Sequence, residues 1–140
     1  MSARIKFCGF TRAEDAALAA TLGVDAIGVV HVPGSKRHLP LEAMPAIRAA
    51  VPEHIDLVAL FVNPDAAAVR AAMQGVDYVF HLAAMISVPE SVQRPHECVE
   101  LNVTGLLNVL EEASAAGVRK LCFSSSAAIY GNNPVVPKLE

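Results

Sequence analysis

The sequence predicts an α/β fold: a five-stranded parallel sheet with helices on both faces, of the Rossmann or flavodoxin type. Short apolar runs alternate along the chain with helical segments, and several of these segments end at a glycine. The runs are apolar throughout instead of alternating with polar residues, which is typical of strands buried on both faces. Because this pattern leaves the strand order open, half a TIM barrel closed by dimerisation is the alternative.

The elements follow one another without a linker, so we expect one domain over residues 1–140. The strands are predicted at residues 5–9, 26–32, 55–62, 76–82 and 120–123. The helices are predicted at residues 11–22, 41–50, 64–75 and 95–117.

Local signals predict how three of the helices begin or pack. Thr11 and Glu14 have the spacing of a capping box. Asn63 is the expected N-cap of the third helix, with Pro64 in its first turn. Gly105 lies inside the long fourth helix, which suggests that the helix approaches the sheet closely there.

Composition excludes several classes of protein. The net charge of −3, with both signs interspersed, argues against a nucleic-acid partner, and no apolar run is long enough to cross a membrane. Without a signal-peptide pattern, we expect a soluble, cytoplasmic protein. Its three cysteines are then reduced, and their spacing predicts no metal site. The sequence leaves open whether the chain forms a homodimer.

Residues 4 to about 72 resemble phosphoribosylanthranilate isomerase, a TIM barrel of tryptophan synthesis. The stretches that carry the resemblance are Ile5–Thr11, Gly23–Gly28, Gly34–Arg37 and Leu60–Pro64. The resemblance implies that Cys8 matches the general base and that Arg37 lies near the substrate. The strand with the general acid and the phosphate-binding loops have no counterpart here, so we interpret Cys8 as a vestigial catalytic residue.

Residues from about Gly75 onward resemble a nucleotide-sugar epimerase, an extended short-chain dehydrogenase. The matching stretches are Val76–Ala84, Val88–Ser91, Asn102–Gly105 and Phe123–Gly131. The resemblance implies that Ser126 binds a sugar hydroxyl and that Leu82, Ala83 and Asn102 belong to the cofactor site. These roles are vestigial too, because the turn Cys8–Arg12 lacks the glycine-rich NAD motif and the chain ends before a Y-x-x-x-K pair.

The two resemblances meet just before Gly75, dividing the domain into segments 1–74 and 75–140. We therefore expect an engineered or recombined chimera that serves as a scaffold, with no catalysis. No cofactor is expected. NAD would bind only if the epimerase-like part retains its binding site. The alternatives are nucleotide or phosphate binding at the carboxyl ends of the strands, and weak isomerase or epimerase-type activity.

Overall fold

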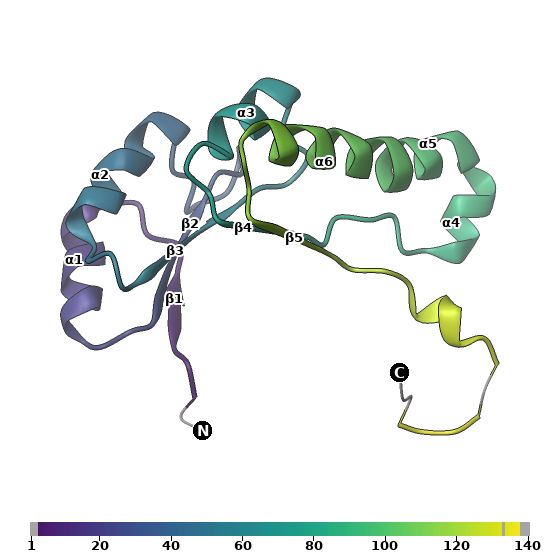
Figure 1. Ribbon diagram of the computed structural model, residues 1–140, viewed down its shortest axis with the longest axis horizontal. Coiled ribbons are helices and arrows are strands. Elements are labelled where there is room, and N and C mark those ends of the chain that lie inside the picture. Colours follow the sequence, from purple (N-terminus) through teal and green to yellow (C-terminus); the bar gives the residue numbers. More distant parts are fainter. Residues whose placement is uncertain (1–2, 133, 138–140) are drawn as a thin grey trace. The chain divides into compact units, whose positions relative to one another are not determined.

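Five parallel strands alternate with helices in the computed structural model, which describes residues 3–132 and 134–137 (Figure 1). The strands form two sheets, one with the order β1-β2-β3 and one with β4-β5. The chain divides into two compact units between Gln74 and Gly75, with one sheet in each. The predicted α/β class with parallel strands is confirmed, and the described residues form no closed barrel. That they fold as one domain stays a prediction.

The division into two sheets differs from the single five-stranded sheet expected from the sequence. Apolar runs predict where strands lie, but hydrogen bonds between edges decide which strands share a sheet. In the first unit the strand order follows the chain, with Ile27 paired to both Phe7 and Leu57. In the second unit Val79 pairs with Leu121.

The described residues of the first unit form three strands and three α-helices. Its elements are β1 (Lys6–Cys8), α1 (Ala13–Thr21), β2 (Ala26–Val30), η1 (Leu41–Ala43), α2 (Met44–Ala50), β3 (Asp56–Leu60) and α3 (Ala66–Ala72). The apolar β2 is the central strand, and its first four residues are buried. The predicted burial is therefore confirmed for this run, but it is wrong for β1 and β3, which contain no buried residue.

The core of the first unit lies between the sheet and two helices. Ile27 and Val29 of β2 are fully buried and cluster with Ala16 of α1 and Ile47 of α2. Because side chains alternate along a strand, Gly28 faces the opposite side of the sheet. Helices α1 and α2 contact each other and pack on the same face of the sheet (Figure 1). The sequence, in contrast, predicts helices on both faces.

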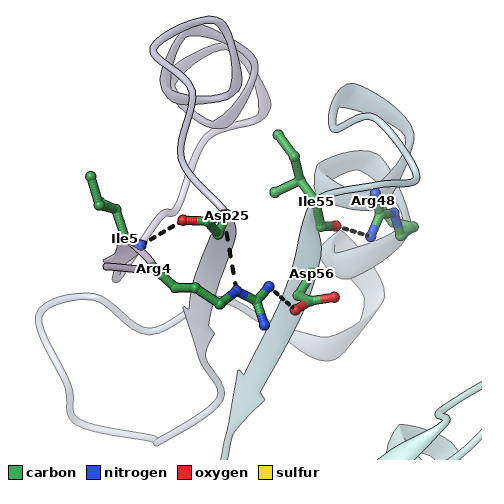
Figure 2. A network of polar contacts seen from close by, with 6 residues as sticks. All are labelled: Arg4, Ile5, Asp25, Arg48, Ile55 and Asp56. Carbon is green, nitrogen blue, oxygen red and sulfur yellow. Dashed lines mark hydrogen bonds and ion pairs between the residues drawn. The ribbon is translucent and has the colours of Figure 1, made fainter. Parts of the chain in front are cut away.

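A polar network ties the amino-terminal ends of the three strands together (Figure 2). The amide of Ile5 donates to Asp25 Oδ2 at 2.6 Å, and Arg4 Nη2 donates to Asp56 Oδ2 at 2.9 Å. Arg4 Nε also lies 3.9 Å from Asp25 Oδ1. Arg48 of α2 donates to three carbonyl oxygens in the turn before β3, those of Val51, Pro52 and Ile55.

From Gly75 on, the part of the chain that the structure describes has two strands and one nearly continuous helical segment. Its elements are β4 (Tyr78–His81), α4 (Val88–Gln93), α5 (Pro95–Val99), η2 (Glu100–Thr104), α6 (Gly105–Ala115), β5 (Lys120–Phe123) and η3 (Ala127–Tyr130). The turn η2 is π-helical and joins α5 to α6. Among the described residues after Gln74, Ala113 is the one buried apolar side chain. No helix in the described part of the chain could span a membrane.

Three of the local predictions are wrong. Arg12, not Thr11, is the N-cap of α1, and Glu14 bonds the Arg12 side chain instead of capping the helix. Asp65 caps α3 by accepting from the Ala68 amide at 2.8 Å, while Asn63 takes a positive φ of 46° in the preceding turn.

The third wrong prediction is the close approach of the helix to the sheet at Gly105. A methyl group there would meet the Glu100 carbonyl oxygen at 3.6 Å, an ordinary contact within the same helical segment.

Helix α4 was not predicted from the sequence. Its N-cap Ser87 accepts from the amide of Glu90, and this S-x-x-E spacing was the available signal.

Candidate functional site

Cys8 lies at the carboxyl end of β1 with an exposed thiol. Its side chain crosses Gly28 of β2, where a methyl group would come within 2.5 Å of the Cys8 sulfur. Glycine at this position therefore makes room for the thiol. The carboxyl edge of a parallel sheet is where ligands bind in α/β proteins, so the thiol occupies a reasonable place for a reacting group.

Arg37 comes from the loop after β2 and reaches the same edge. Its Nη1 donates to the Cys8 carbonyl oxygen at 3.4 Å. Its side chain also lies over Gly9, where a methyl group would be 2.3 Å from the Arg37 Cδ. The structure thus brings together Cys8 and Arg37, the two residues singled out by the isomerase resemblance.

His31 holds this loop in place, and the sequence analysis did not identify it. It is buried, its Nδ1 donates to the Leu39 carbonyl oxygen at 2.6 Å, and its ring stacks on Phe61. The Leu39 amide in turn donates to the carbonyl oxygen of Val30 at 2.8 Å. A polar residue at the end of the apolar run that forms β2 was the signal that could have found it.

The carboxyl edge of the two-stranded sheet carries the candidates from the second segment. Strands β4 and β5 end at the same position along the sheet, because their last residues, His81 and Phe123, are paired. The loops that follow therefore leave the same edge, with Leu82 and Ala83 exposed on one and Ser126 exposed on the other. The Ser126 hydroxyl accepts from the Ala128 amide at 3.2 Å, so it caps the turn η3.

Asn102 is a structural clamp in the second unit. From η2 it accepts the Met85 amide at 2.8 Å and donates to the Met85 carbonyl oxygen at 3.1 Å. A second amide hydrogen points to the Cys98 sulfur at 3.4 Å. The side chain thereby fixes the loop after β4 instead of projecting toward a ligand.

The first βα turn does not fit the pyrophosphate of a dinucleotide. In such a site, free amides and the start of a helix face the phosphates. Here the amides of Gly9 and Phe10 both donate to the Gly28 carbonyl oxygen, at 2.8 and 3.1 Å. Arg37 also covers Gly9. Among the described residues, no cluster of three or more His, Cys, Asp or Glu side chains could hold a metal ion.

Comparison with known proteins identifies the fold class and then the family. The parallel strands and intervening helices align with UDP-glucose-4-epimerase from Stenotrophomonas maltophila at a TM-score of 0.51, with 27% identity. That alignment covers 98% of this chain and 41% of the epimerase. The profile described as the NAD dependent epimerase/dehydratase family matches residues 20–140. The chain belongs to this family.

The amino-terminal part is similar to a second group of proteins. N-(5'-phosphoribosyl)anthranilate isomerase from Bordetella petrii is 47% identical over 76 residues, 54% of this chain and 34% of the relative. The isomerase of Staphylococcus aureus strain RF122 is 48% identical over 62 residues, which is 30% of its length. The chain therefore spans about a third of the isomerases that it matches.

Both predicted resemblances are confirmed, and together they are consistent with a chimera. Their limits overlap more than the sequence analysis expects. The epimerase profile begins at residue 20, upstream of Gly75, within the part that is similar to the isomerases.

Proposed function

We propose that this chain is an α/β scaffold that turns over neither an isomerase nor an epimerase substrate. One observation carries the proposal: local main-chain hydrogen bonds already engage the polar groups that a site would need. Asn102 binds Met85, Ser126 caps η3, and the amides of Gly9 and Phe10 close onto β2. Groups engaged in this way hold the fold in place.

Isomerase chemistry requires a base and an acid positioned together. The side chain that reaches Cys8 is that of Arg37, and a guanidinium stays protonated in proteins and cannot serve as the acid. Arg37 therefore does not complete a base–acid pair with Cys8.

We further propose that engineering or recombination joined the two segments near Gly75, that NAD is not required, and that the protein is cytoplasmic. The division between the compact units at Gln74 and Gly75 supports such a joint. The closed turn at Gly9 supports independence from NAD.

Turnover assays test the scaffold directly. We expect phosphoribosylanthranilate isomerisation and UDP-sugar epimerisation to stay at the background rate. Turnover that disappears in Cys8→Ala or in Ser126→Ala would contradict the proposal. Leu18→Ala is the matched control, because Leu18 is an exposed residue of α1 and neither resemblance assigns it a role.

Nucleotide or phosphate binding is the second candidate. The specific observation in its favour is the shared edge where the loops after β4 and β5 expose Leu82, Ala83 and Ser126. A ligand that binds the native state must raise its stability, so thermal unfolding with NAD, UDP-glucose or inorganic phosphate is the test. A saturable rise in melting temperature that Ser126→Ala removes would favour binding over a bare scaffold.

A further inference from the structure

His31 is a buried ring with one nitrogen hydrogen-bonded and the other without a partner. It directly follows β2, keeps 8% of its surface exposed, and donates from Nδ1 to the carbonyl oxygen of Leu39, a residue of the core cluster. Among the described residues, its buried Nε2 has no hydrogen-bond partner. A neutral imidazole has one N–H donor and one lone pair, so these contacts fit the neutral ring with its hydrogen on Nδ1.

This ring fastens the end of the loop formed by residues 32–38. Leu39, which accepts from the ring, also donates its amide to the Val30 carbonyl oxygen at 2.8 Å. Phe61 stacks on the ring with the two centroids 5.0 Å apart. Every one of these neighbours belongs to the first unit. Arg37 lies within the loop, so its place at the carboxyl edge of β1 depends on these contacts.

A second proton on the ring does not suit this closed position. Both nitrogens of a protonated imidazole donate, so Nε2 would carry a hydrogen with no acceptor. Burying a charge that has no partner costs far more free energy than burying the neutral ring. When the loop opens, water can solvate both N–H groups. Acid therefore shifts the loop toward the open arrangement, and the closed one returns as the ring loses its proton.

The charged side chains on the elements around the ring do not supply the missing acceptor. Those of the loop, of η1, of α2 and of the segment after β3 are exposed or bonded to other groups: Lys36, Arg37, His38, Glu42, Arg48 and Asp65. Only the two carboxylates of this set could accept from a protonated ring, and neither bonds Nε2. The cations of the set would repel it.

We propose that His31 is a pH-sensitive switch: its neutral ring holds the 32–38 loop closed, and protonation releases the loop. Opening takes one proton from solvent onto Nε2 and breaks two hydrogen bonds, from Nδ1 to Leu39 and from the Leu39 amide to Val30. Arg37 then leaves the Cys8 carbonyl oxygen, while the sheet remains paired. The switch works in the same way whether or not the chain binds a nucleotide or turns over a substrate.

Amide hydrogen exchange of Leu39 tests the switch, because this amide is bonded to Val30 only while the loop is closed. Its protection factor, from which the intrinsic pH dependence of exchange is divided out, should fall at least about tenfold between about pH 7.5 and about pH 5.5. One proton taken up on opening limits the change to about tenfold per pH unit. The amides of β2 within the sheet should keep their protection.

Two histidine variants separate this switch from other titrating groups. His31→Asn removes the ionisable ring and keeps an amide donor near the place of Nδ1, so Leu39 protection should become independent of pH. His38→Asn is the matched control, because His38 is exposed in the same loop, and it should keep the wild-type pH response. A response that disappears in His38→Asn but persists in His31→Asn would overturn the proposal.

Nitrogen NMR of the wild-type ring decides the question even if His31→Asn does not fold. We expect the neutral ring with its hydrogen on Nδ1 at about pH 7.5, and on acidification the ring should gain its proton as Leu39 loses protection. A ring that is protonated while Leu39 stays protected would show that the closed loop accepts the cation, and it would overturn the proposal. Equal protection of Leu39 at both pH values, or an equal loss throughout β2, would do the same.

Discussion

Arg12 and Glu14 form an ion pair at the start of α1. The hydrogen bond from Arg12 lowers the pKa of the Glu14 carboxyl below its ordinary value of 4.5. We expect Arg12→Ala to raise the pKa of Glu14 toward 4.5, and a titration of side-chain carbon shifts by NMR would measure it. Arg4→Ala is the matched control and should leave Glu14 unchanged, since Arg4 pairs with Asp25 and Asp56 instead.

The direction of the associated pH dependence follows from the lowered pKa. The folded chain favours the charged carboxylate of Glu14, so its contribution to stability is present above the pKa of the unfolded state. That contribution is lost as the pH falls through the lower pKa of the folded state. Because both side chains are exposed, added salt should weaken the effect. A Glu14 pKa that salt does not move would contradict this account.

Gly105 offers a stabilising substitution. Its φ of −58° is helical, and the nearest atom to an added methyl group is the Glu100 carbonyl oxygen at 3.6 Å. Gly105→Ala should therefore raise the free energy of unfolding by about 0.5–1 kcal/mol, through helix propensity and a less flexible unfolded chain. Urea denaturation would measure the change.

Gly9→Ala is the contrasting variant. Gly9 has a φ of +93°, and an added methyl group would collide with Arg37. We expect this substitution to destabilise the protein. A destabilising Gly105→Ala would instead indicate that the helix packs more closely than the structure shows.

At the scale of elements, Asp25 connects β1 to β2 (Figure 2). Asp25→Ala removes the acceptor of the Ile5 amide and should cost about 1 kcal/mol of unfolding free energy. Arg4→Ala removes exposed ion pairs with Asp25 and Asp56 and should cost less, about 0–1 kcal/mol, with a dependence on salt. Unfolding in urea, which adds no salt, measures both variants. Equal losses of unfolding free energy would show that the ion pairs contribute as much as the hydrogen bond.

The same elements show how far the sequence predicts this structure. The apolar runs predict the strand positions, but their burial holds for β2 alone: the run Ala26–Val32 contains this central strand, whereas β1, β4 and β5 have no buried residue. The caps at Thr11 and Asn63 were mispredicted, because a capping pattern competes with other partners, here Arg12 for Glu14 and Asp65 for α3. Side-chain type alone does not decide that competition.

The candidate sites were predicted in part for a similar reason. Cys8 and Arg37 are close together, as their motif implies, since the loop of Arg37 returns to the end of β1. The role of His31 was not predicted, because it depends on contacts with Leu39 and Phe61 that no local sequence pattern encodes. Asn102 hydrogen-bonds Met85, and its assignment to the cofactor site stays a prediction.

At the scale of the whole molecule, the two units differ in how much apolar surface they bury. The first has a core built around Ile27 and Val29, while the second buries only Ala113 among its described residues. Local opening is easiest where few apolar contacts must be broken. Amide hydrogen exchange should therefore be at least about tenfold faster in β4 and β5 than in β2.

Ile27→Ala tests whether the two units open independently. The substitution creates a cavity in the first core and should cost about 2–5 kcal/mol there. If the units are independent, protection is lost in β1, β2 and β3, while the amides of α6 and β5 keep their exchange rates. Leu18→Ala, an exposed position on α1, should change neither set. A parallel loss of protection in both units would instead mean that residues 1–140 unfold as the single cooperative domain predicted from the sequence.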